Sequence, residues 1–180
     1  FTEKDSKVWV GTDGGGVNII DLEDNSIKVL SNVPGDPSSF PAHSIKTIYT
    51  DNYGNIWAGS TRNGLIRITQ SGMKTYTDSH IGLPSGLSNA SAICLFQEDG
   101  EDVIWVGTDG GGINLIDLKS NEFTCLTHTT GDPASLPANS VTQLYKDYND
   151  QLWIGSVRGG VINIKDSYIN TYQDVILNHT

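Results

Sequence analysis

The segment VWVGTDGGGVNII, residues 8–20, recurs in similar form three more times along the chain, and this repetition indicates the architecture. Its counterparts are IWAGSTRNGLIRI at 56–68, IWVGTDGGGINLI at 104–116 and LWIGSVRGGVINI at 152–164. The four tryptophans, at positions 9, 57, 105 and 153, are therefore 48 residues apart with no gap. A fixed period of about 20–50 residues is typical of solenoids and propellers. Within each stretch, alternating apolar residues on both sides of a glycine-containing segment predict a strand, a turn and a strand.

Two further strands are predicted in each unit. Residues 44–55, 90–102 and 140–151 are apolar at alternate positions and end in Asp-rich turns, which indicates a strand before the tryptophan. Shorter candidates follow the glycine turns at 26–31, 73–78, 122–127 and 169–174. No 3.6-residue apolar period lies between them. Four short antiparallel strands per repeat indicate one blade of a β-propeller, so the chain is predicted to be all-β, with about four four-stranded blades.

The expected organisation is a single propeller segment over residues 1–180. Its blades are predicted over about 8–43, 44–89, 90–139 and 140–180, the first incomplete because no strand is recognised before Val8. We interpret this as a fragment of a larger propeller, with an imperfectly closed ring of four blades as the alternative. An open half-ring exposes apolar blade faces. A homodimer that closes one ring of about eight blades is therefore expected.

A second period of 96 residues overlies the first. The loop GDPSSFPAHS at 35–44 returns as GDPASLPANS at 131–140, and the phrase WVGTDGGG occurs in the first and third units. The second and fourth units instead place Arg62 and Arg158 where the others have Gly14 and Gly110. The pattern indicates duplication of a pair of blades.

Charge and composition exclude several classes of protein. The 180 residues include 21 Asp and Glu against 11 Lys and Arg, a net charge of −10 without a basic cluster, so nucleic acid is not an expected partner. The apolar runs fall far short of the roughly 20 residues of a membrane helix. Cys94 and Cys125 lack metal-site spacing and are expected to be free thiols, and the four histidines are scattered. We therefore expect neither a metal nor a cofactor.

The repeated tryptophans are expected to be structural. A tryptophan at one position of every blade buries a large flat surface between neighbours, and the glycine two residues later lets the next backbone approach closely. Such periodic residues with the same apolar neighbours are typical of a core. We therefore do not count the tryptophans among the ligand-binding residues.

The candidate binding residues come from blade topology. In a four-stranded blade, the turn between the second and third strands shares a face with the connection to the next blade. This places the turns at 13–16, 61–64, 109–112 and 157–160 beside the loops at 35–44 and 131–140, and long loops on a rigid scaffold carry binding groups. The candidates on this face are Arg62, Arg158, Asp36, Asp132, His43 and Asn139. The alternative is that the arginines bridge to acidic neighbours and that Asp-Pro-x-Ser is turn chemistry. No catalytic residue is predicted.

The repeat units share the motif (I/V/L)W(V/A/I)G(T/S)xxGG(V/I/L)xx(I/L), which follows a strand with the pattern S(I/V)xx(I/L)xxDxxGx. This combination resembles the two-component regulator propeller repeat. The resemblance covers nearly the whole chain in four copies, with departures at Asn63 and at GEDV, residues 100–103. It implies the periplasmic sensor domain of a Bacteroides-type hybrid two-component system. Such a parent protein is anchored in the inner membrane and carries its histidine kinase in other domains, which are absent from these residues.

The resemblance implies a non-enzymatic function for this segment. The expected function is a periplasmic propeller segment that responds to an oligosaccharide and transmits a conformational change to a kinase. Its expected partners are the oligosaccharide and neighbouring blades or domains of the parent sensor. Two alternatives stay open: a polysaccharide lyase or hydrolase on the same fold, and a scaffold that binds only proteins.

Overall fold

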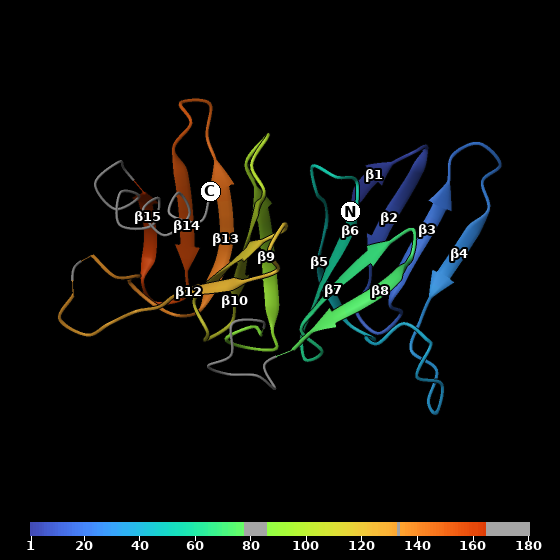
Figure 1. Cartoon of the computed structure of the whole chain (residues 1–180), viewed down its shortest axis with the longest axis horizontal. Coiled ribbons are helices and arrows are strands. Elements are labelled where there is room, and N and C mark those ends of the chain that lie inside the picture. Colours follow the sequence, from blue (N-terminus) through green and yellow to red (C-terminus); the bar gives the residue numbers. More distant parts are fainter. Residues whose placement is uncertain (78–85, 133, 165–180) are drawn as a thin grey trace.

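The computed structural model describes residues 1–77, 86–132 and 134–164. Over these residues the chain forms fifteen strands in four antiparallel sheets. Figure 1 shows the sheets following one another along the molecule in chain order. The predicted all-β fold of repeated antiparallel blades is confirmed. Within the described residues, no helix is long and apolar enough to cross a membrane.

Each sheet is a meander in which strands adjacent in sequence are hydrogen-bonded. Blade 1 contains β1 (Thr2–Lys4), β2 (Lys7–Gly11), β3 (Val17–Asp21) and β4 (Ile27–Leu30). Blade 2 contains β5 (Ile45–Thr50), β6 (Ile56–Ser60), β7 (Leu65–Thr69) and β8 (Gly72–Tyr76). Blade 3 contains β9 (Ala92–Gln97), β10 (Val103–Thr108), β11 (Ile113–Asp117) and β12 (Phe123–Leu126). Blade 4 contains β13 (Val141–Lys146), β14 (Leu152–Ser156) and β15 (Gly160–Ile164).

The expectation that no strand precedes Val8 is wrong. Strand β1 pairs antiparallel with β2, with Glu3 opposite Val8 and Thr2 opposite Trp9. Its three residues, TEK, are too few and too polar to show the apolar alternation on which strand assignment from sequence depends. The expected last strand of blade 4, at residues 169–174, lies outside the described residues.

Three apolar cores lie between consecutive blades. Blades 1 and 2 share one core, which joins Val17 and Ile19 to Ile45 and Ile48. Equivalent cores join blades 2 and 3, where Trp57 is completely buried, and blades 3 and 4. Blades 2 and 3 therefore each contribute one face to the previous core and one to the next, because strand side chains alternate between faces.

The glycine two residues after the repeated tryptophan permits close packing of the next blade, as predicted, at Gly11, Gly59 and Gly107. A Cβ atom added at Gly59 would lie 2.6 Å from Thr47 Cγ2 and 2.7 Å from the carbonyl oxygen of Ala92 in blade 3. At Gly155 of blade 4, the nearest atom would be Thr142 Oγ1 of the same blade, at 3.2 Å. The close approach therefore occurs only where another blade packs against the glycine.

The described blades form an open arc. Strand β4 and strand β15 lie at opposite ends of the longest axis (Figure 1). Val161 of blade 4 is 67% exposed, whereas its repeat equivalents Val17, Leu65 and Ile113, each buried toward the following blade, are 0% exposed. Blade 4 thus presents, among the described residues, an uncovered copy of a face that is core elsewhere in the chain.

Candidate functional site

The turns and long loops named from the sequence gather on one face, the lower edge of the molecule in Figure 1. Backbone hydrogen bonds join them. The amides of Gly14 and Gly16 donate to the carbonyl oxygen of His43 at 3.1 and 2.8 Å. Ninety-six residues later, the amides of Gly110 and Gly112 donate to the carbonyl oxygen of Asn139 at 3.1 and 2.7 Å. Each glycine turn therefore holds the loop that leads into the next blade.

The structure brings Arg62 close to His43. The amide of Thr61 donates to the carbonyl oxygen of Ser44 at 3.3 Å, so the residues adjacent to this bond lie on neighbouring segments. Both Arg62 and His43 are exposed on this face. These two exposed polar residues, the first pair, lie on adjacent segments at the junction of blades 1 and 2.

The second pair repeats the first. The amide of Val157 donates to the carbonyl oxygen of Ser140 at 2.9 Å, which places Arg158 beside the loop that contains Asn139. Blade 3 lies between the two pairs along the arc (Figure 1). The candidate residues therefore form two separate sets rather than one cluster. The side-chain oxygen of Asn139 is already engaged, because it accepts a hydrogen bond from the amide of His128 at 2.6 Å.

The two candidate aspartates cap their own loops. Asp36 accepts hydrogen bonds from the amide and the hydroxyl of Ser38, at 2.9 and 2.6 Å, and the hydroxyl bond is the main cause of its lowered pKa. Asp132 accepts one from the amide of Ala134 at 2.8 Å. Both carboxylates are exposed but committed to turn chemistry. These contacts favour the arginines over the aspartates as ligand-binding groups.

Arg158 has an unusual backbone conformation. Its φ is +66°, in the left-handed region that costs a residue with a Cβ atom about 1 kcal/mol. At the same repeat position Gly14 and Gly110 have φ values of +95° and +100°. The arginine therefore stands where glycine would be unstrained, a situation that favours a role beyond the fold.

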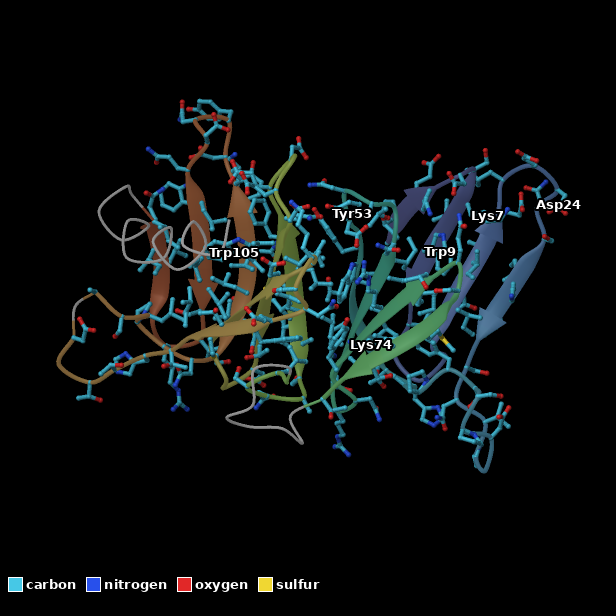
Figure 2. The ribbon with its side chains drawn as sticks, viewed as in Figure 1. Lys7, Trp9, Asp24, Tyr53, Lys74 and Trp105 are labelled. Atoms are coloured by element: carbon cyan, nitrogen blue, oxygen red, sulfur yellow. The ribbon has the colours of Figure 1, made fainter. Side chains whose placement is uncertain are left out.

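A groove between blades 1 and 2 is the feature that reasoning from the sequence missed. It has a volume of about 580 Å³, and its apolar wall comes from Trp9 of blade 1 and from Ile56 and Ile68 of blade 2. Figure 2 shows Trp9 and Tyr53 on the two blades that border it. The rest of its lining is Lys4, Tyr53, Gly54, Asn55, Thr69, Gln70 and Ser71. Nothing in the repeat pattern sets Trp9 apart from the other three tryptophans, so the groove could not be predicted from the repeat.

Comparison with known proteins identifies the repeat. The two component regulator propeller family matches residues 39–62 and 135–158, each of which runs from a long loop through the first two strands of blade 2 or blade 4. No curated protein matches the chain by sequence.

Solved structures share the fold. The extracellular domain of BT3049 of B. thetaiotaomicron, which is named as a hybrid two component system, superposes with a TM-score of 0.71 at 22% identity over 89% of this chain and 21% of its own. The extracellular domain of BT4673 from the same organism superposes with a TM-score of 0.51 at 15% identity, over 89% of this chain and 26% of its own. The designed protein Ika4 has a TM-score of 0.54 at 15% identity, over 91% and 86%.

The chain thus spans only about a fifth to a quarter of the two natural domains. At these identities the likeness establishes the fold, and the matched segments establish the type of repeat. The protein carries the two component regulator propeller repeat on a propeller fold that it shares with the extracellular domain of a two-component system.

Proposed function

We propose that this chain is a non-enzymatic, ligand-sensing propeller segment of a periplasmic two-component sensor, and that the ligand is an oligosaccharide. The observation that carries the proposal is the match of the regulator propeller family to residues 39–62 and 135–158. Those segments end at Arg62 and Arg158 and include parts of the loops that adjoin the two arginine turns. The extracellular domain with the same fold supports a location outside the cytoplasm.

The chemistry of the binding face suits recognition rather than turnover. Arg62 and Arg158 are exposed donors, each on a turn whose backbone is bonded to the neighbouring loop. Hydroxyl and carboxylate groups of a sugar accept hydrogen bonds from such side chains. The carboxylates of Asp36 and Asp132 are engaged in their own loops and are poorly placed as an acid and base pair. A ligand that binds one conformation more tightly then shifts the sensor toward it, and kinase activity resides in the parent protein's other domains.

A second copy of the chain, or another blade of the parent protein, is the partner proposed for the uncovered face of blade 4. Tyr145 and Val161 on this face are 59% and 67% exposed. Blade 1 offers the complementary face at the other end of the arc, where Val8 and Val10 are only half-buried. Two copies that join these faces twice would close one ring.

The test of the sensing function is calorimetric titration with a panel of oligosaccharides, compared for the wild-type chain, Arg62→Ala and Arg158→Ala. We expect binding by at least one glycan, a loss of about fivefold in affinity for one of the variants, and unchanged melting temperatures. Lys28→Ala, on outer strand β4, is the control. Glycan cleavage by the purified chain would instead establish an enzyme, and a chain that binds no glycan but captures other domains of its parent would be a scaffold.

A further inference from the structure

The groove between blades 1 and 2 differs from the equivalent position one blade later. Between blades 2 and 3 the gap is closed by Asn52, whose amide donates to Gln97 Oε1 at 2.8 Å. Its side-chain nitrogen donates to the carbonyl oxygens of Glu98 and Glu101 at 2.9 and 3.2 Å. Lys4 occupies the corresponding position of blade 1, 48 residues earlier; its ammonium pairs with Asp5 of its own blade at 3.5 Å, and its side chain passes Gly54 of blade 2 without a hydrogen bond to it. The hairpins of blades 1 and 2 are therefore not tied together by this residue.

The tryptophans at the two blade interfaces also differ. Trp57 is covered by the ring of Tyr76, stacked at 5.8 Å, and by the guanidinium of Arg67, 5.2 Å from the indole centroid. Beside Trp9 the cross-strand partner that corresponds to Arg67 is Ile19, an aliphatic side chain. Trp57 is fully buried, whereas Trp9 remains half-buried and lines the groove.

Several polar groups in the groove are uncommitted. In the part of the chain that the structure describes, neither the Trp9 indole N–H nor the Gln70 amide has a hydrogen-bond partner, whereas the Trp57 indole N–H donates to Asp51 at 2.8 Å. The Lys4 ammonium has only its 3.5 Å ion pair with Asp5. The groove thus combines an aromatic and aliphatic wall with free donors at its rim, within the size range of about 300–1,000 Å³ for small-molecule sites.

We propose that this groove is a saccharide subsite in which one pyranose ring packs against Trp9 and its hydroxyl groups accept hydrogen bonds from Trp9 Nε1, Gln70 and Lys4. A pyranose ring has C–H bonds on one face and hydroxyls around its edge, which matches the wall and the rim. Lys4 can also pair with the carboxylate of a uronic acid. The proposal rests on the proposed oligosaccharide-sensing function and adds a contact at the interface of blades 1 and 2, apart from the arginine turns.

Occupation of this groove also provides a route to signalling. The groove is bordered by residues of both blades, so a bound ring bridges them and favours one relative position of blades 1 and 2. The apolar wall of the groove adjoins the core that the two blades share, because Trp9 and Ile68 pack against the cluster that contains Val17, Ile45 and Ile48.

The test uses the whole chain on an array of neutral and uronate-containing oligosaccharides, followed by calorimetric titration of the tightest binder. We expect Trp9→Ala to weaken binding about tenfold and Gln70→Ala and Lys4→Ala about fivefold each. Lys28→Ala serves as the control, being an exposed lysine outside the groove. A larger effect of Lys4→Ala on uronates than on neutral glycans would identify an acidic ligand, and equal effects a neutral one.

Each outcome decides between the two proposals. Binding that is unaffected by Gln70→Ala, Lys4→Ala and Trp9→Phe overturns the groove as a subsite but leaves the sensing function standing. An absence of binding to every glycan on the array overturns both. Since Gln70 is exposed and lies outside the apolar core, Gln70→Ala remains informative if Trp9→Ala fails to fold.

Discussion

The carboxylate of Asp51 accepts a hydrogen bond from the indole nitrogen of Trp57 at 2.8 Å, six residues further along the chain. The same relationship recurs at Asp147 and Trp153, at 2.7 Å. Asp51 also accepts hydrogen bonds from the amides of Tyr53 and Asn55, at 3.0 and 2.7 Å, and so fixes the hairpin between β5 and β6. One side chain therefore couples the turn chemistry of the repeat to its most buried aromatic residue.

Asp51→Ala is expected to destabilise the protein by about 2–3 kcal/mol, because it leaves a buried indole N–H and two turn amides without their acceptor. Asp147→Ala is the matched variant in blade 4, where Trp153 is only half-buried, and should cost less. Urea unfolding of both variants measures the difference. Equal losses of stability would show that burial of the tryptophan does not determine how much its hydrogen bond to the aspartate stabilises the protein.

Gly59→Ala is expected to destabilise the protein by about 1–3 kcal/mol, because the added methyl group would meet Thr47 and the backbone of Ala92. Gly155→Ala is its control, since the methyl group there would meet only atoms of its own blade, Thr142 at 3.2 Å and Gln143 at 3.5 Å or more. Differential scanning calorimetry of the pair gives the test. A loss at Gly155 as large as that at Gly59 would contradict an uncovered face on blade 4.

Arg158→Gly is expected to raise stability by about 1 kcal/mol, because glycine adopts the φ of +66° without strain. Arg62 has no such φ, so Arg62→Gly should not be stabilising. Thermal denaturation checks both variants. If Arg158→Gly is more stable but binds the oligosaccharide more weakly, the strained arginine serves binding. If the variant is instead less stable than the wild type, Arg158 has a structural role.

Stability is expected to fall in acid. A hydrogen bond from Lys119 lowers the pKa of Asp102, and bonds from Lys7 and Trp153 lower the pKa values of Asp21 and Asp147. A carboxyl whose pKa is lower in the folded state stabilises the protein above its ordinary pKa of about 3.9, and this contribution is lost as the pH falls through the folded value. Urea unfolding at about pH 7, 5 and 3 should therefore show little change between the first two and a clear loss at the third. Stability that is constant or higher at the lowest pH would refute this linkage.

The mass of the chain in solution tests the proposed pairing of blades 1 and 4. Light scattering coupled to size exclusion should give about twice the chain mass of 19.4 kDa. Val161→Asp should return the monomer, because it places a charge on the apolar face without touching an existing core. A wild-type chain that is monomeric at high concentration would leave the face to another blade of the parent protein.

The sequence specified the architecture because each repeat encodes its blade locally. The 48-residue spacing of the tryptophans, the alternation around them and the glycine turns are all short-range signals, and they predicted the strands of blades 2 and 3 and the close approach at Gly59. Strand β1 was missed because its pairing with β2, and not its three residues, makes it a strand. The turn chemistry of Asp36 was an open alternative that only its contacts with Ser38 could favour.

The candidate sites depend on tertiary structure for a different reason. Trp9 and Trp57 occupy the same repeat position, but the free energy of burial of each depends on side chains from a neighbouring strand and from the next blade. The same holds for Val161, whose exposure follows from what packs on it. The repeats therefore specify that blades form and in what order they follow one another. Which blade face stays uncovered and which groove stays open depends on the packing of one blade against the next, because exposure and groove shape are properties of pairs of blades.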